Sequence, residues 1–173
     1  MTERDPDLSL QGFDLWLHDQ AFPDADDPWS RELLEFSVLL KIGASTVNDE
    51  GTLSKAALAQ FSNELALMLK TLRGEAILEA GEASIMFMLT LSMKPLGHVE
   101  MAVDLRSYDG YERHQFRVDL DQSYLEPFAR QVRACVASHP SEFKVQARRK
   151  EASPSGIGAR LLDAIFGKPL DPT

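Results

Sequence analysis

The chain has 173 residues, 44% of them apolar and 26% charged, which is typical of one soluble globular domain with terminal extensions. No apolar run approaches the roughly 18 residues of a membrane span, and a single cysteine, Cys135, excludes an internal disulfide and a cysteine-based zinc site. The amino terminus is acidic and polar, unlike a secretory signal peptide, so we expect a cytoplasmic protein.

The net charge of −9 is concentrated in the first part of the chain. Residues 1–50 contain twelve Asp or Glu against three Lys or Arg, whereas residues 51–173 contain fifteen of each. The acidic residues are densest at Asp24, Asp26 and Asp27. An acidic surface repels nucleic acid and anionic membranes and attracts a basic partner, so we expect neither of the first two as a ligand. The alternative is a solvated loop that only aids solubility.

The first fifty residues predict a paired arrangement of two strands. Residues 1–8 are charged, contain a proline and are expected to be disordered. Residues 9–19 alternate, with Phe13, Leu15 and Leu17 on one face, which predicts a half-buried strand. Residues 21–28 contain two prolines and three aspartates and predict a loop. Alternation between residues 34 and 42 then predicts a second strand, antiparallel to the first.

The clearest element is a helix over residues 52–74. Its apolar residues recur at steps of three and four, which places them on one helix face: Leu58, Phe61, Leu65, Met68 and Leu72. Thr52 or Ser54 can cap its amino end, and Gly74 can end it in the left-handed conformation. Residues 48–51, which precede it, read as a turn.

Further strands and a second helix follow this element. Strands are predicted over residues 75–80, 83–93, 98–108 and 111–121. The second of these is the most apolar run in the chain, so it predicts a central strand that packs on both sides. A helix then begins at Asp121 or Ser123, carries Cys135 on its apolar stripe, and ends at His139–Pro140. A small buried hydrophobe is the expected role of Cys135.

The order of these elements predicts an α+β domain over residues 9–139. We expect an antiparallel meander sheet of about five to six strands, with the two main helices packed on one face. Residues 140–173 form an extension with a short amphipathic C-terminal helix, whose apolar side contains Ile157, Leu161, Leu162, Ile165 and Phe166. This helix could pack on its own sheet, dock on another subunit, or serve as a helix-in-groove ligand.

Residues that carry chemistry are sparse. The sequence contains no nucleophile elbow, no glycine-rich phosphate loop and no metalloprotease or calcium-loop motif. The four histidines are not at ligand spacing from one another or from the cysteine, so no metal and no cofactor are predicted. His18–Asp19 and His98–Glu100 could be written as acid–base pairs, but each is more simply a strand residue beside a solvated carboxylate. No catalytic residue is therefore predicted.

Three segments together resemble the WapI-type bacterial immunity proteins and related domains of unknown function. They are residues 59–65 (AQFSNEL), 72–76 (LRGEA) and 121–125 (DQSYL), and the resemblance extends over about residues 8–139. Most of the shared positions are core and capping residues. The extension from Pro140 departs from the family pattern.

The resemblance implies a non-enzymatic cytoplasmic antitoxin that binds and blocks the C-terminal domain of a polymorphic or contact-dependent toxin. Such domains are often basic, and an acidic inhibitor gains fast association from complementary charge. We expect the inhibitory face to contain Asp24, Asp26, Asp27 and Glu32 as a steering rim and Trp29 as an apolar anchor. The competing interpretation is an adaptor or scaffold protein that docks through its C-terminal helix, and a homodimer is compatible with either.

Overall fold

The element order ββββα occurs twice in the computed structural model, which describes residues 4–81, 85–107 and 109–143. The first unit comprises β1 (Leu8–Leu10), β2 (Phe13–Gln20), β3 (Leu33–Ile42), β4 (Ser45–Ser54) and α1 (Lys55–Thr71). The second comprises β5 (Glu75–Ala80), β6 (Ile85–Met93), β7 (His98–Ser107), β8 (Arg113–Asp121) and α2 (Leu125–Ser138). Within the described residues, each unit is a four-stranded antiparallel meander followed by one helix.

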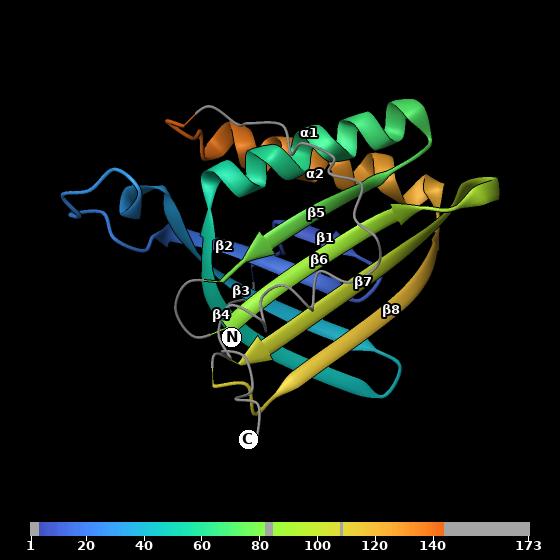
Figure 1. Cartoon of the computed structure of the whole chain (residues 1–173), viewed down its shortest axis with the longest axis horizontal. Coiled ribbons are helices and arrows are strands. Elements are labelled where there is room, and N and C mark those ends of the chain that lie inside the picture. Colours follow the sequence, from blue (N-terminus) through green and yellow to red (C-terminus); the bar gives the residue numbers. More distant parts are fainter. Residues whose placement is uncertain (1–3, 82–84, 108, 144–173) are drawn as a thin grey trace, which may run out of the picture.

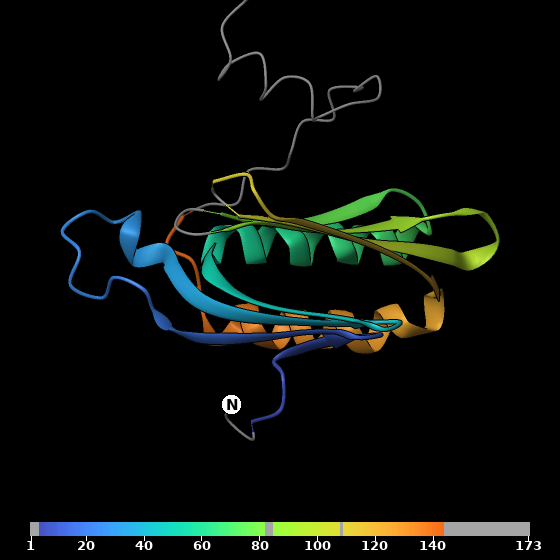
Figure 2. The same ribbon diagram turned by 90° about the horizontal axis from the view of Figure 1, so that it is seen from below.

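The two meanders form separate sheets that face each other (Figures 1 and 2). The helices lie side by side along one edge of this pair of sheets, where α1 contacts β5 and α2 contacts β1. The prediction of an α+β fold with an antiparallel meander and two main helices is thus confirmed in outline. The single sheet of five to six strands with both helices on one face is wrong, because eight strands divide into two sheets.

The first predicted strand is a hairpin. β1 pairs antiparallel with β2, and the turn between them contains Gln11 and Gly12 with φ angles of 45° and 85°. Two consecutive positive φ angles are typical of the tight turn that joins twisted strands. Residues 48–51, predicted as a turn, instead lie within β4, which pairs with β3 over ten successive positions.

Helix α1 matches its prediction closely. The Ser54 side chain accepts a hydrogen bond from the backbone N–H of Ala57 (3.0 Å), which satisfies one of the free donors at the helix start. Leu58, Phe61, Leu65 and Met68 are all buried. The last predicted apolar residue, Leu72, is 54% exposed, since the helix ends there in the left-handed conformation (φ 51°).

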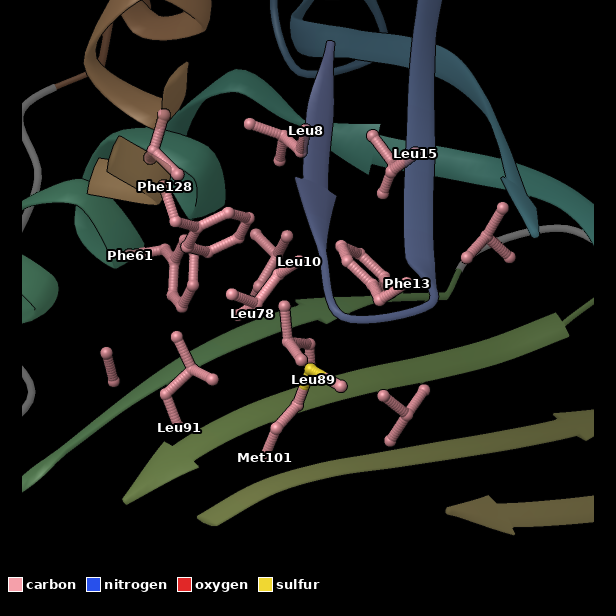
Figure 3. Close-up of a cluster of buried hydrophobic side chains, with 14 of the residues drawn as sticks. Leu8, Leu10, Phe13, Leu15, Phe61, Leu78, Leu89, Leu91, Met101 and Phe128 are labelled. Carbon is pink, nitrogen blue, oxygen red and sulfur yellow. The ribbon is translucent and has the colours of Figure 1, made fainter. Parts of the chain in front are cut away.

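One hydrophobic core joins the two sheets and the helix pair (Figure 3). Phe87 of the second sheet contacts Phe13 and Phe36 of the first, with ring centroids 6.1 and 5.6 Å apart. Phe128 of α2 packs edge-on against Phe13 and against Phe61 of α1. All five rings are fully buried. Since these rings come from five different elements, the units cannot bury their apolar faces independently.

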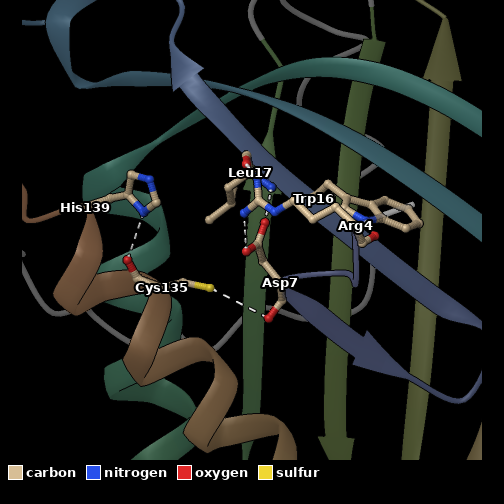
Figure 4. A network of polar contacts seen from close by, with 6 residues as sticks. All are labelled: Arg4, Asp7, Trp16, Leu17, Cys135 and His139. Atoms are coloured by element: carbon tan, nitrogen blue, oxygen red, sulfur yellow. Dashed lines mark hydrogen bonds and ion pairs between the residues drawn. The ribbon is translucent and has the colours of Figure 1, made fainter. Parts of the chain in front are cut away.

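Residues 4–8 differ from the predicted disorder because they are fastened to β2 and α2 (Figure 4). The Asp7 carboxylate accepts a hydrogen bond from the N–H of Leu17 (2.8 Å), and the Trp16 indole donates to the carbonyl of Arg4 (2.9 Å). Cys135 lies beside this segment, its thiol 3.8 Å from the carbonyl oxygen of Asp7. The helix α2 and the amino-terminal segment thus cover each other.

The Cys135 thiol is expected to be unreactive in the folded protein. Only 7% of the residue is exposed, and burial, together with the negative charge of Asp7, raises the pKa of the thiol to about 11. The thiolate, which is the reactive form, is therefore scarce at neutral pH. Labelling with a colorimetric disulfide reagent should be slow in buffer and rapid in urea. Fast stoichiometric labelling of the native protein would contradict this placement.

Asp104 organises the outer face of the second sheet. Burial alone would raise the pKa of its carboxyl, but hydrogen bonds from Arg113 (2.7 and 3.0 Å), Arg106 (2.8 and 3.2 Å) and Gln115 (3.2 Å) outweigh burial and hold the pKa well below the usual range. Because the pKa is lower in the folded state, the stabilisation is present above the ordinary aspartate pKa of about 4 and is lost as pH falls below it.

Replacing Asp104 with asparagine should therefore destabilise the fold more at neutral than at acidic pH. Both arginines are 39–46% exposed, so solvent screening limits the expected loss at pH 7 to about 1–2 kcal/mol. Urea unfolding should show that the free energies of unfolding of D104N and the wild type become more similar as pH falls from about 4 to about 2. A difference independent of pH would show that the ionised carboxylate is not the stabilising group.

Candidate partner-binding site

The connection between β2 and β3, residues 21–32, projects from one end of the molecule (Figure 1). Asp24, Asp26 and Asp27 are exposed on it, as the sequence predicts. The strand β2 ends in an irregularity between Leu17 and Gln20, where the register with β3 shifts. This irregularity directs the chain out of the sheet, because an extra residue bends a strand locally.

Hydrogen bonds give this connection a defined conformation. At its base the N–H of Ala21 donates to the carbonyl of Leu33 (2.9 Å), and the Gln20 side chain donates to the carbonyl of Arg31 (2.8 Å). Asp27 accepts from the N–H of Ser30 (2.9 Å) at the start of the short 3-10 helix Ser30–Glu32. The loop is therefore built around a capping turn rather than being only a charged linker.

The three aspartates have different environments. Hydrogen bonds from the side chain and backbone of Ser30, with the nearby charge of Arg31, lower the pKa of Asp27. Asp24 and Asp26, in contrast, make no hydrogen bond or ion pair with any residue that the structure describes. Asp27 thus shapes the loop, whereas Asp24 and Asp26 are exposed to solvent without such partners.

Aromatic side chains lie beside these charges. Trp29 is 48% exposed, and its ring centroid lies 6.0 Å from that of Phe143 at an interplanar angle of 52°. Phe143 follows α2, so two segments far apart in sequence meet here. Asp24, Asp26, Asp27, Trp29 and Phe143 are called the acidic–aromatic surface below. Half-exposed aromatic rings flanked by charge are typical of protein-binding surfaces.

Glu32 is not part of this exposed surface, which corrects its assignment to the steering rim. Only 2% of the residue is exposed. Its carboxylate accepts hydrogen bonds from the Ser141 hydroxyl (2.5 Å) and from the N–H of Glu142 (2.9 Å). Glu32 therefore fastens the segment after α2 to the base of the loop and holds Phe143 against Trp29.

Replacing Glu32 with alanine should loosen this junction. The change removes two hydrogen bonds to a buried carboxylate, for which we expect a loss of about 1–3 kcal/mol in the free energy of unfolding. It should also change Trp29 fluorescence, because Phe143 is no longer held beside the indole. Glu35 is exposed three residues away and serves as the control, with an expected loss of about 0.5 kcal/mol or less for E35A. An equal loss in the free energy of unfolding of E32A and E35A would show that Glu32 does not hold the segment after α2 in place.

An open groove of about 770 Å³ runs along the base of the loop. It is lined by the end of β2, by the start of α1, and by the end of α2 with the residues after it, including His18, Asp19, Lys55, His139 and Glu142. His18 is hydrogen-bonded to the Ser37 hydroxyl (2.6 Å), and Glu100 pairs with Lys94 (3.3 Å), so neither acid–base pair written from the sequence is formed. In the described part of the chain no cluster of His, Cys, Asp and Glu could hold a metal ion.

The family comparison agrees with the region that this architecture occupies. The sequence model of the immunity protein WapI-like family matches residues 7–140, which covers both ββββα units. The chain belongs to the WapI-like immunity protein family. The predicted resemblance is therefore confirmed, and the family places the chain among immunity proteins against toxins.

Other comparisons are distant. Comparison with curated protein sequences finds no significant match. Among solved structures the chain is similar to the plant transcriptional regulator PBF-2, with a TM-score of 0.47 and 8% identity over 73% of this chain and 75% of that one. None of the helices that the structure describes is long and apolar enough to cross a membrane.

Sequence reasoning found part of this surface and missed part. The exposed positions of Asp24, Asp26 and Trp29 follow from the polar, proline-bounded loop. Phe143 was missed, and the only signal for it was an isolated aromatic after the helix-ending His139–Pro140. The predicted docking residues Ile157, Leu161, Leu162, Ile165 and Phe166 lie outside the described residues.

Proposed function

We propose that this protein is a non-enzymatic immunity protein that binds the C-terminal domain of a bacterial toxin and blocks it by occupying its surface. The observation that carries the proposal is the WapI-like family match over residues 7–140. The acidic–aromatic surface supports a stoichiometric binding role, because it offers charge and an apolar anchor. Inhibition would take place in the cytoplasm and require no cofactor, nucleic acid or membrane.

The acidic–aromatic surface suits a basic partner. Asp24 and Asp26 would steer the encounter and speed association, since exposed charges act mainly through the association rate. Trp29 and Phe143 would supply the apolar centre, where buried aromatic residues contribute most of the binding energy. Glu32 would keep the two aromatic segments together before the partner arrives, which lowers the entropy cost of binding.

Co-purification with the product of the neighbouring gene tests this function. The C-terminal domain of the protein encoded immediately upstream should be expressed with this chain and purified through a tag on one of them. Tight stoichiometric binding, with relief of growth inhibition by that domain, would support the immunity role. An upstream product unrelated to toxins, and no binding, would contradict it.

Truncation distinguishes this role from an adaptor that docks through its C-terminal helix. The structure shows where to cut, because Ser141 and Glu142 hold Glu32, and Phe143 packs on Trp29. A chain that ends at Phe143 keeps these contacts and lacks residues 157–166. We expect it to retain the toxin domain, whereas an adaptor would lose its partner.

A further inference from the structure

The outer face of the second sheet combines exposed apolar residues with charges. Side chains of β5–β8 alternate between the core and this face, and the outward apolar positions are Ile77, Met86, Met88 and Ala102. Met86 is 41% exposed, and within the described residues β6 packs on one side only, which differs from the predicted strand that packs on both sides. Among the described residues no helix or strand lies over this face (Figure 2).

The outer face of the first sheet is different. Its outward leucine, Leu39, is only 7% exposed, and the amino-terminal segment is hydrogen-bonded to Trp16 and Leu17 on the edge of that face. The methionines of β6 have no such cover in the described part of the chain. Methionine side chains are flexible and polarisable, which suits them to a surface that packs against a partner.

Charges on the outer face of the second sheet are separated along the strand direction. The strand register places Glu75, Glu100 and Asp119 in one row across the sheet, and Met86, Arg106 and Arg113 in a row at the other end. Arg106 and Arg113 share the single carboxylate of Asp104, so these three side chains together carry one net positive charge, while Glu79, in the same row as Asp104, adds a negative charge at the β5 edge of the sheet. Lys94 pairs with Glu100, but the acidic row keeps a net negative charge.

We propose that this face binds a second copy of the chain, through a two-fold axis that lies across the strands. This rotation lays the acidic row of each copy (Glu75, Glu100 and Asp119) on the basic row of the other (Met86, Arg106 and Arg113). Asp119 then comes opposite Arg113 of the second copy, and Glu100 comes opposite Arg106. Thr90 and Met88 meet at the centre. A two-fold interface must be self-complementary, and this face meets that condition.

The size of the face suits a weak, reversible dimer. Four strands spaced about 4.8 Å apart, each contributing about nine residues of 3.4 Å, give roughly 600 Å² per copy. The total of about 1,200 Å² is the lower limit for a stable interface. The acidic–aromatic surface lies at the β2–β3 connection and the segment after α2, outside this face, so each copy of the dimer remains free to bind a partner.

Sedimentation velocity of the full chain over a concentration series tests the dimer. The wild type should change from the 19.3 kDa monomer to a dimer as concentration rises. M86E places a carboxylate in the row of Arg106 and Arg113, where it faces the acidic row of the second copy, and D119K places a cation opposite Arg113 of the second copy. Each variant should raise the dimer dissociation constant about tenfold or more.

Two control variants carry the same chemical changes elsewhere on the surface. Leu67 is 60% exposed on α1 and Glu35 is exposed on the first sheet, so L67E and E35K should leave the dissociation constant unchanged. A wild type that stays monomeric throughout would overturn the proposal. A dimer dissociation constant that M86E and D119K leave unchanged would also overturn it. So would an equal rise of the dissociation constant in the control variants L67E and E35K. Toxin binding by M86E at wild-type affinity would separate this surface from the proposed toxin site.

Discussion

Replacing both Asp24 and Asp26 with lysine should slow association with the proposed toxin domain and weaken binding about 10- to 100-fold. These carboxylates make no hydrogen bond or ion pair with the described residues, so we expect the change to alter the field around the loop and to leave its conformation intact. Asp27 is excluded because it accepts the hydrogen bond from Ser30. Association rates measured at low and high salt should also show a flatter salt dependence for the variant.

The control for this experiment is a pair of exposed acids far from the loop. Glu75 on β5 and Glu112 in the β7–β8 connection give the same change in net charge when both are replaced with lysine. We expect this control to bind almost as fast as the wild type, since steering depends on where the charges lie. Equal slowing in the two variants would mean that net charge alone matters and that the loop is not the binding site.

Replacing Gly12 with alanine should be among the most destabilising single changes in the chain. A Cβ atom there would lie 2.2 Å from the backbone carbonyl oxygen of Lys41, and φ is +85°. The backbone cannot retreat easily, because the N–H of Lys41 donates to the carbonyl of Gly12 (2.7 Å). Strain and steric overlap together predict a loss of about 2–5 kcal/mol in the free energy of unfolding, measurable by urea denaturation.

Gly43 provides the matched comparison. It also has a positive φ (+62°) in a tight hairpin turn, but a Cβ there meets nothing within 4 Å. The free energy of unfolding of G43A should therefore fall by only about 1 kcal/mol, which is the cost of a positive φ for alanine. Similar losses in G12A and G43A would show that the hairpin turn at Gly12 can move away from Lys41.

The helix α1 could be predicted well because its determinants are local. The spacing of Leu58, Phe61, Leu65 and Met68 sets the buried face, and the Ser54 hydroxyl sets the start. The hairpin at Gln11–Gly12 also left a local signal. The buried positions shift from even numbers (Leu8, Leu10) to odd numbers (Phe13, Leu15) across the turn. A two-residue turn has this effect, and a continuous strand does not.

The division into two sheets could not be predicted from local patterns. β4 contains Asn48, Asp49 and Gly51, residues that disfavour strands, and it forms a strand because β3 offers ten pairing positions. Neither the alternation of a strand nor its turns specify which hairpins share a sheet. That choice depends on contacts between distant residues, such as Phe13 with Phe87.

The acidic–aromatic surface shows the same limit at the scale of a site. Composition was enough to predict an exposed acidic loop. It could not separate Glu32 from the other acids, because the groups that bury it, Ser141 and Glu142, lie more than one hundred residues away. The segment after α2 therefore changes both the membership of the surface and the point at which a truncation should end.

Trp29 fluorescence during titration with the toxin domain tests the central claim most directly. The chain has two tryptophans, and W16F leaves Trp29 as the only reporter. We predict a saturable blue shift that ends at one toxin domain per chain, because the half-exposed indole becomes buried in the interface. Calorimetry in the same buffer should give the same stoichiometry. Tight binding by calorimetry with an unchanged Trp29 spectrum would contradict the acidic–aromatic surface as the toxin-binding site.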